Sequence, residues 1–583
     1  MAPITTRTKL LTFTIISLSS VVLADSDNFD WNSVSLNPYS YCPDYKISLA
    51  ALSVTLCLTL LTDSSQVPLD YTFPAAGNAS IAITRYPSNS SKSDYLGPVL
   101  LNPGGPGLSG VDYVVGVGAD IATALGDEFD IVGFDPRGVS YSTPIVSWFK
   151  TEVERALWMP PSLSTVYPSL NESSEAVAQQ WARAQVQGQF AAERNQDYMQ
   201  HMTTDNIARD MLRITEAFGW EKLQYWGISY GSVLGSTFAS MFPDKVGRLV
   251  VDGVLDMESW YSANLTSEMV DLDKALKIFA DGCYAAGPEN CAFYASSSAK
   301  ISANISQLLD SVKTQPVPVM TLISYNVFGY TLLKNVIFDA FYTPYQLFAP
   351  LAQSLADLAK GNASTIYTMG VEVPHFECES NSTSSVPFHE NTYEAGVTIA
   401  CGDVGPVNDT VSQLQDFYSN AKNVSNSFAD LVSNWRVWCS TFRSAQYELP
   451  IVSHRQYSRS RHTYFGCKEH RGSLPWICAV NVRRSCGMSP FLAFTQLSPD
   501  PNVQHTSVNA PSICVYGYLR QYFRNGTLPA IGTVCTPDNP LFPSSNSTDL
   551  SGRDLTSRSE MLHAGRAISD VYHRITSAHK SRV

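Results

Sequence analysis

The chain has 583 residues, of which 44% are hydrophobic and 16% are charged, as expected of a folded globular protein. It carries 39 basic and 52 acidic side chains, which gives a formal net charge of −13, and its strand and turn motifs contain no basic stripe. Nucleic acid and anionic membrane surfaces are therefore poor candidates for partners. The length exceeds that of one common domain, but a single large α/β core with insertions would account for it.

The first 24 residues have the pattern of a secretory signal peptide. Arg7 and Lys9 precede a short apolar run over residues 10–18, and Val22 and Ala24 occupy the small-residue positions before the cleavage site. The apolar run is shorter than the ~20 residues that a membrane span needs. We therefore expect a secreted, extracellular protein with no membrane association after cleavage, and disulfides among its 12 cysteines.

Acceptor sites for N-glycosylation, with the pattern Asn-x-Ser/Thr, occur along most of the chain, which fits passage through the secretory pathway. Their asparagines are Asn78, Asn89, Asn171, Asn264, Asn304, Asn362, Asn381, Asn408, Asn423, Asn525 and Asn546.

Two apolar segments upstream of the chain's midpoint each lead into a glycine-containing turn. A strand is expected over residues 98–103, and it runs into Gly104-Gly105-Pro106-Gly107. A second strand, over residues 129–134, is closed by Asp135-Pro136-Arg137-Gly138. A glycine-rich loop at a strand end leaves backbone N–H groups unencumbered, as an oxyanion hole requires. Gly104 and Gly105 are therefore candidate oxyanion donors.

The segment that organises the chain is a strand, a sharp turn and a helix around Ser229. The apolar run over residues 223–228 enters Gly227-x-Ser229-x-Gly231, and small and apolar residues then continue to Ala239. In a nucleophile elbow the serine occupies the strained turn, and the flanking glycines let neighbouring backbone pass without a Cβ clash. Ser229 is thus the candidate nucleophile, and the N–H of Tyr230 is the candidate second oxyanion donor.

The three motifs, in this order, resemble those of an α/β hydrolase of the proline-iminopeptidase and tripeptidyl-aminopeptidase type. The resemblance implies an α/β fold with a mostly parallel central sheet and a mainly helical lid insertion. It implies a hydrolase that uses no metal or organic cofactor and acts on peptide or ester substrates. Relative to the family's usual pattern, residues 47–62 look inserted, and part of the segment is either translated intron or a family-specific loop.

A helical stretch is expected over roughly residues 173–218, with an N-cap in Thr203-Thr204-Asp205-Asn206, and the next buried strand over residues 248–254. Residues 258–430 then lose the alternation of strands and helices, and the resemblance makes this segment the lid. Within it, Cys283 and Cys291 flank a short loop that suits a disulfide better than a metal site.

The carboxyl-terminal third resembles the C-terminal domain of tripeptidyl-aminopeptidase-like hydrolases, from His505-Thr506-Ser507 through to Cys535. The resemblance makes His505 the general base, and the order Ser229 before His505 is the one that α/β hydrolases require. Cys514 and Cys535 flank an expected helix over residues 518–523, and we expect a disulfide between them.

The third member of the triad has several candidates. Residues 453–488 contain no strand-length apolar run and no match to the family's acid-bearing segment. Glu469 has suitable spacing to His505 but lies in a basic stretch, and Asp500 is too near. Asp252 or Asp256, after the preceding strand, could supply the acid instead. Alternatively residues 449–494 are an out-of-frame or mis-spliced segment, and we would then expect the sheet to lack a strand beside His505.

The expected organisation has five parts: a signal peptide over 1–24, the first part of the hydrolase core over 25–257, the lid over 258–430, the C-terminal part of the core over 431–550, and a tail over 551–583. The expected function is that of a secreted serine aminopeptidase that releases short N-terminal peptides or residues through an acyl-enzyme. An esterase and a catalytically impaired hydrolase-fold protein are the alternatives.

Overall fold

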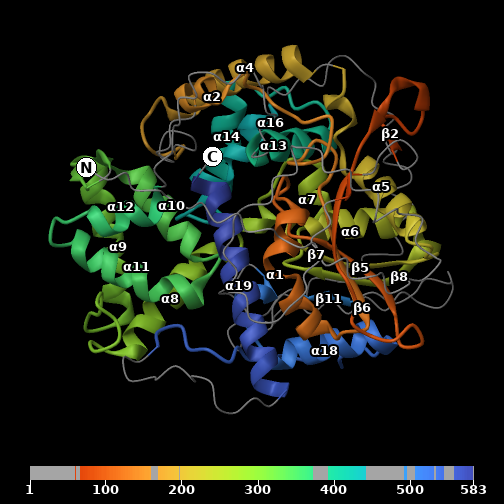
Figure 1. Ribbon diagram of the computed structural model, residues 1–583. Helices are drawn as coiled ribbons and strands as arrows, with labels where there is room; N and C mark the ends of the chain where they lie inside the picture. Colours follow the sequence, from red (N-terminus) through yellow and green to blue (C-terminus); the bar gives the residue numbers. More distant parts are fainter. Residues whose placement is uncertain are drawn as a thin grey trace, which may run out of the picture.

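The computed structural model describes residues 59–60, 66–158, 169–195, 197–322, 324–371, 391–440, 492–494, 506–530, 533–543 and 557–581 (Figure 1). The expected signal peptide, Glu469, Asp500, His505, and the sequons at Asn381 and Asn546 lie outside these residues, as does most of the segment 449–494.

The core is a seven-stranded sheet in the order β1-β4-β6-β5-β7-β8-β11. Pairing is parallel from β6 through β5, β7 and β8 to β11, whereas β4 runs antiparallel to β6 and β1 runs antiparallel to β4. The predicted α/β fold with a mostly parallel sheet is confirmed. The strands are β1 (Thr59–Leu60), β4 (Ala82–Tyr86), β5 (Gly97–Asn102), β6 (Phe129–Phe134), β7 (Leu223–Ile228), β8 (Val246–Asp252) and β11 (Leu492–Phe494).

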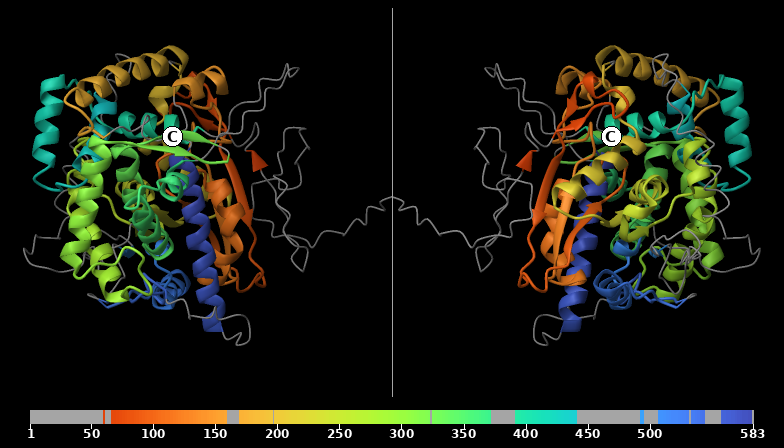
Figure 2. Two further views of the ribbon diagram at one scale, coloured as in Figure 1. Left: turned by 90° about the vertical axis from the view of Figure 1, so that its left-hand side faces the viewer. Right: turned by 90° about the vertical axis from the view of Figure 1, so that its right-hand side faces the viewer.

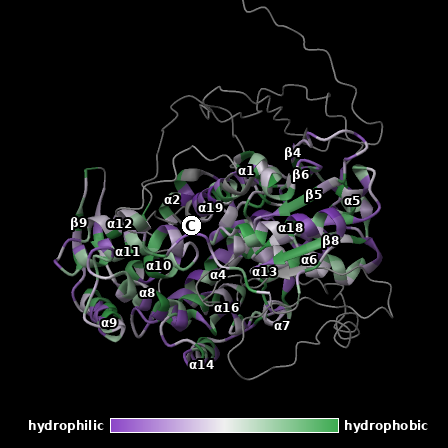
Figure 3. Ribbon diagram, turned by 90° about the horizontal axis from the view of Figure 1, so that it is seen from below, coloured by the Kyte–Doolittle hydropathy of each residue, from purple (hydrophilic) through white to green (hydrophobic). Residues whose placement is uncertain are grey.

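Helices cover both faces of the sheet because its central strands are apolar on both sides. Every residue of β5 and β6 is buried, and alternate side chains enter different clusters: Leu100 packs with one and Val99 and Leu101 with the other. Figure 3 shows β5 and β8 as hydrophobic strands among the helices. The helices are α5 (Thr204–Ala217) and α6 (Tyr230–Met241) on the Leu100 face, and α1 (Gly110–Leu125), α18 (Ile513–Asn525) and α19 (Ser557–Ser581) on the other.

A second hydrophobic core lies beside the sheet, in the helical group at the left of Figure 1. It includes Phe279, Leu333 and Phe348, all buried. This core explains why residues 272–371 show no strand–helix alternation: their apolar faces are buried mainly against one another. Its elements are α8 (Leu272–Ala286), α9 (Ser298–Thr314), the hairpin β9 (Val317–Met320) and β10 (Tyr325–Phe328), α10 (Tyr330–Ala340), α11 (Pro344–Leu358) and α12 (Ser364–Gly370).

The rest of the expected lid joins the main core instead. Tyr393 is buried in the same cluster as the Leu100 face of the sheet, together with Trp438, which lies beyond residue 430 and so outside the expected lid. The helix that carries Trp438 packs against the helix of Tyr393 and against α4 (Ala176–Asn195). The helices are α13 (Thr392–Asp403), α14 (Val411–Ala421), α15 (Ala429–Val432), α16 (Asn434–Cys439) and, from before the elbow, α4 (Ala176–Asn195), with α2 (Glu152–Trp158) preceding it (Figures 1 and 2).

Two expectations need correction. Residues 557–581 were expected within a tail, but they form α19, which packs along α1 because Met561, Ala564, Ile568 and Tyr572 recur on one face. The second concerns the alternative that residues 449–494 are mis-spliced, under which the sheet would lack a strand there: β11 instead pairs in parallel with β8, with Phe494 opposite Asp252. No helix among the described residues is both long and apolar enough to cross a bilayer.

Three disulfides link the described cysteines. The predicted bridges Cys283–Cys291 and Cys514–Cys535 are both present. A third, Cys401–Cys439, joins the ends of α13 and α16 and was not expected from the sequence.

Candidate active site

Ser229 lies at the turn between β7 and α6, with the backbone geometry of a nucleophile elbow. Its φ of 56° and ψ of −118° are rare for a residue with a side chain, at a cost of about 1–3 kcal/mol. The surrounding structure holds this conformation, since the Ser229 N–H donates to the backbone oxygen of Asp252 at 2.7 Å. The two glycines of the motif are required by contact: a Cβ at Gly227 would lie 2.2 Å from the oxygen of Gly231.

The glycine-rich loop after β5 lies directly against this elbow. A Cβ on Gly104 would be 2.5 Å from the oxygen of Ile228 and 2.9 Å from the Cβ of Ser229, so only glycine fits there. The Gly104 N–H donates to the Asn102 side-chain oxygen at 3.0 Å, which occupies that donor and favours Gly105 for binding an oxyanion. Sequence reasoning missed Asn102, because an asparagine at a strand end carries no distinctive pattern.

The backbone N–H of Tyr230 begins helix α6, and its position matches that of the second donor. The first N–H groups of a helix have no partner within the helix, and the helix dipole favours negative charge beside them. The hypothetical Cβ on Gly104 lies 3.2 Å from the Tyr230 nitrogen, so the loop and the helix N-terminus meet at one place. An oxyanion formed on a substrate held by Ser229 would be stabilised there.

The Asp135-Pro136-Arg137-Gly138 turn stabilises the loops around the elbow through hydrogen bonds, and we assign it no part in the chemistry. Asp135 accepts hydrogen bonds from Ser109 Oγ at 2.7 Å and from the Val111 N–H at 3.1 Å, which fixes the start of α1. Burial raises the pKa of Asp135 to about 7. Arg137 is buried and makes a two-pronged contact with Asp210, at 2.8 and 2.6 Å.

Asp252, at the end of β8, is connected both to the nucleophile and to the chain next to His505. Its backbone oxygen accepts from Ser229, and its carboxylate accepts from the N–H of Ser507 at 2.7 Å and from the Ser507 hydroxyl. The side chain is 1% exposed, and burial raises its pKa to about 6, with the Ser507 hydrogen bonds opposing the rise. Ser507 is two residues after His505.

The structure describes one of the two other carboxylates that remained candidates from the sequence, Asp256, but not Glu469. Asp256 is the N-cap of the short helix α7 (Met257–Tyr261), where its side chain accepts from the N–H of Ser259 at 2.9 Å. It is therefore committed to capping. Among the described residues, no group of three or more His, Cys, Asp and Glu side chains is arranged to hold a metal ion.

Residues 97–281, which contain all of these elements except the segment after His505, match the family model described as the alpha/beta hydrolase fold. The chain contains an α/β-hydrolase fold. It is similar to a tripeptidyl aminopeptidase of Streptomyces coelicolor, at 37% identity over 35% of the chain and 37% of that protein. It is similar also to the serine protease Hip1 of Mycobacterium tuberculosis, at 34% identity over 33% of the chain and 35% of that protein.

These alignments thus cover little more than a third of the length of the relatives. A weaker likeness covers most of the chain: a protein named carboxylesterase B from Mycobacterium tuberculosis is 25% identical over 87% of the chain and 90% of that protein. Among solved structures, a proline iminopeptidase of Mycobacterium smegmatis aligns over 42% of the chain and 59% of its own, at 16% identity and a TM-score of 0.21, which adds nothing to the assignment.

Proposed function

We propose that this α/β hydrolase is a secreted serine aminopeptidase that releases short peptides or single residues from the free N-termini of peptides. The observation that carries the proposal is the strained elbow at Ser229, packed against the loop after β5, in which only glycine fits at position 104. A strained serine at such a turn is a mark of function rather than of stability. The names of the relatives, tripeptidyl aminopeptidase and serine protease, favour a peptide substrate.

The reaction is acyl transfer through a covalent intermediate. His505 takes the proton of the Ser229 hydroxyl as its oxygen attacks the scissile carbonyl, and the N–H groups of Gly105 and Tyr230 stabilise the resulting oxyanion. The intermediate then collapses, and the leaving amine receives the proton from His505. Water repeats the sequence on the acyl-enzyme, which releases the carboxylic acid and restores Ser229. Removing one oxyanion donor costs about 10²–10³ in kcat in a comparable enzyme.

For the acid of the triad we propose Asp252, with Glu469 as the competing candidate. Support comes from the contact of the Asp252 carboxylate with Ser507, two residues from His505, and from its backbone link to Ser229. The acid of a triad holds the imidazole in the correct tautomer and stabilises its charged form. Asp252→Asn should lower kcat by about four decades on that basis, whereas Glu469→Gln should leave it unchanged. The reverse result would assign the role to Glu469.

Secretion is supported by several features besides the basic and apolar start of the chain. The three disulfides need an oxidising compartment. The acceptor asparagines among the described residues are on the surface: Asn304 is partly exposed, and Asn78, Asn89, Asn171, Asn264, Asn362, Asn408, Asn423 and Asn525 are exposed. A shift in mass on treatment of the purified protein with a peptide N-glycosidase tests this part of the proposal.

Residues 258–430 are proposed to form the lid of the site. Two of its elements lie against the catalytic elements: Trp260 packs its ring 5.4 Å from that of Tyr230, and a Cβ on Gly107 would lie 2.3 Å from the backbone oxygen of Thr392 in α13. A lid in this position limits the size of the substrates that can reach Ser229.

Three matched substrates separate the possible activities. A tripeptide amide with a free N-terminus should be cleaved, and the same peptide with an acetylated N-terminus should not. A p-nitrophenyl ester tests the esterase alternative, which is supported by the likeness to carboxylesterase B. Hydrolysis of the ester with neither peptide cleaved would assign an esterase. No reaction with any of the three would leave an inactive hydrolase fold.

A further inference from the structure

Helix α13 contacts the glycine loop, which supplies one proposed oxyanion donor, and is linked through Thr204 to Tyr230, which supplies the other. Its first turn packs on the glycine loop: besides the close approach of Gly107 to Thr392, a Cβ on Gly396 would lie 2.6 Å from the backbone oxygen of Pro106. Just before the helix, the Asn391 side chain donates to the backbone oxygens of Gly138 and Val146, at 2.7 and 2.6 Å. The N-terminal end of α13 is thus fixed to the loops that border the elbow.

The C-terminal end of α13 is fixed to the elbow itself through Asp403. One carboxylate oxygen accepts from the backbone N–H of Thr204 at 2.7 Å, and the other accepts from the Thr204 hydroxyl at 2.6 Å and from the Trp260 indole N–H at 2.9 Å. The Thr204 hydroxyl is also 2.7 Å from the hydroxyl of Tyr230. Because Thr204 gives its single hydrogen to Asp403, Tyr230 must donate to Thr204.

A chain of hydrogen bonds therefore runs from Tyr230 through Thr204 to Asp403. It fixes the side chain of the residue that follows the nucleophile, and this side chain is completely buried. The position of the Tyr230 ring constrains the position of its backbone N–H, since the residue begins a helix and cannot rotate independently. A donor in an oxyanion hole must be held close to its productive geometry.

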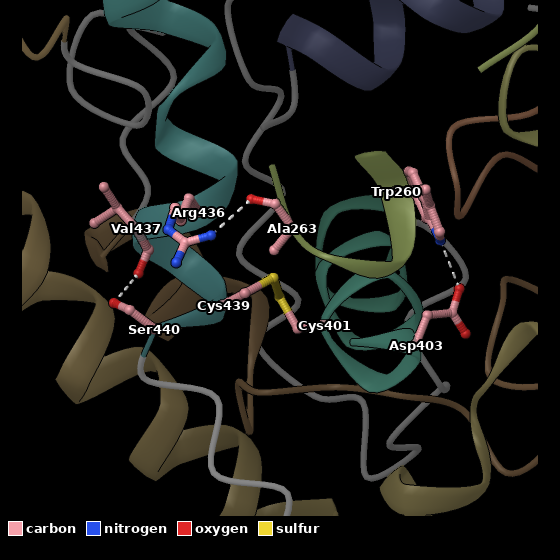
Figure 4. Close-up of a disulfide and its surroundings, with 8 residues drawn as sticks. All are labelled: Trp260, Ala263, Cys401, Asp403, Arg436, Val437, Cys439 and Ser440. Atoms are coloured by element: carbon pink, nitrogen blue, oxygen red, sulfur yellow. Dashed lines mark hydrogen bonds between the residues drawn. A yellow bond between two sulfur atoms is a disulfide. The ribbon is translucent and has the colours of Figure 1, made fainter. Parts of the chain in front are cut away.

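The Cys401–Cys439 disulfide holds Asp403 in this position. Cys401 lies two residues before Asp403 in α13, and Cys439 ends α16, so the bridge joins the two helices with a Cα separation of 5.0 Å (Figure 4). Arg436 of α16 in turn donates to the backbone oxygen of Ala263 at 3.5 Å, close to the helix that carries Trp260. The disulfide, Asp403 and Trp260 thus form one connected group beside the elbow.

We propose that Asp403 is a positioning residue for catalysis: it orients Tyr230 through Thr204, and the Cys401–Cys439 disulfide keeps it in place. This inference rests on the proposed function, because it requires the Tyr230 N–H to act as an oxyanion donor. Asp403 itself touches no reacting atom. Its effect is on the stabilisation of the transition state, so it changes kcat rather than KM.

The test compares variants of the full chain in hydrolysis of the tripeptide amide and in the rate of labelling by a fluorophosphonate. Thr204→Val removes the hydroxyl and breaks the chain of hydrogen bonds, whereas Thr204→Ser keeps it. Asp403→Asn weakens the acceptor. Asp273→Asn is the control, since Asp273 of α8 likewise accepts from a hydroxyl and a backbone N–H, those of Ser425 at 3.0 Å and Ser427 at 3.1 Å, and these partners lie outside the connected group.

Thr204→Val and Asp403→Asn should lower kcat and the labelling rate by roughly 10- to 100-fold with KM nearly unchanged, the size of effect that small misplacement causes. Thr204→Ser and Asp273→Asn should behave as the wild type. The proposal is overturned if both Thr204→Val and Asp403→Asn keep the wild-type kcat, or if they only raise KM or lower the melting temperature. If Asp403→Asn does not fold, the comparison of Thr204→Val with Thr204→Ser decides alone. A wild-type chain that is neither labelled nor active overturns the proposed function, and this inference with it.

Discussion

Replacing Asp252 by Asn should increase stability and abolish most of the activity, and both effects follow from the burial of this carboxylate. Its pKa is raised from the ordinary value of 3.8 to about 6, mainly by burial. A pKa that is higher in the folded state means that folding favours the protonated form. The stability associated with protonated Asp252 is therefore complete below pH 3.8 and is lost as the pH rises through 6.

The size of the loss follows from the difference between the two pKa values, 6 − 3.8, or about 2. A difference of one between the folded and unfolded pKa values corresponds to about 1.4 kcal/mol. Ionised Asp252 therefore lowers the free energy of unfolding by up to about 3 kcal/mol at pH 8. Asparagine is neutral at every pH and has nearly the same shape, and its amide can accept from the Ser507 N–H and donate to the Ser507 hydroxyl. Asp252→Asn should therefore raise the free energy of unfolding at pH 8 by up to about 3 kcal/mol.

Denaturation by urea, with disulfides intact, measures this effect for wild type and variant at pH 8 and at pH 4. The difference between the two proteins should shrink towards zero at the lower pH, while hydrolysis at pH 8 is lost. A variant that is less stable than the wild type by the same amount at both pH values would contradict the reasoning, because the carboxylate would then contribute packing or hydrogen bonds that asparagine cannot replace. Unchanged hydrolysis would show that Asp252 is not the acid.

Two further changes test the architecture around the site. Gly104→Ala should abolish labelling of Ser229, because its Cβ would press on the elbow, whereas Gly405→Ala, with no atom within 4 Å, is the matched control and should be labelled normally; normal labelling of Gly104→Ala would disprove the close packing. Replacing Cys514 and Cys535 together by serine should lower stability by roughly 3 kcal/mol, from the 21-residue separation that the bridge closes. Alkylation of either cysteine in the unreduced protein, detected by peptide mapping, would show that this bridge does not form.

The sheet around the elbow was predictable because local sequence determines it. Apolar runs flanked by glycine turns gave β5, β6 and β7 nearly at their observed bounds. The glycines of the elbow are needed for steric reasons that act within a few residues, so the motif at Ser229 is visible in the sequence. The bridge Cys283–Cys291 was predictable for the same reason, since its cysteines are only eight positions apart in the sequence.

Features that join distant segments were not predictable. The contact of Asp403 with Thr204 spans 199 residues, and although Thr204 lies in a recognisable N-cap motif, that motif does not indicate a distant partner. Cys401 could have paired with any of several cysteines, because the number of pairings of 12 cysteines is large. The apolar face of α19 was present in the sequence, but its partner α1 lies more than 400 residues away. For the acid, the sequence left Glu469, Asp252 and Asp256 open, and our proposal of Asp252 rests on its contact with Ser507, a contact that joins segments 255 residues apart.

The most direct test of the account is labelling of the purified chain by a fluorophosphonate, followed by mass spectrometry of the labelled peptide. The account predicts that the label is found on Ser229, and that Ser229→Ala removes it while leaving the melting temperature nearly unchanged, since the side chain is small. A chain that takes up no label when an authentic serine hydrolase is labelled in the same tube would contradict the proposed function. Label that persists in Ser229→Ala would show that another serine is the reactive one.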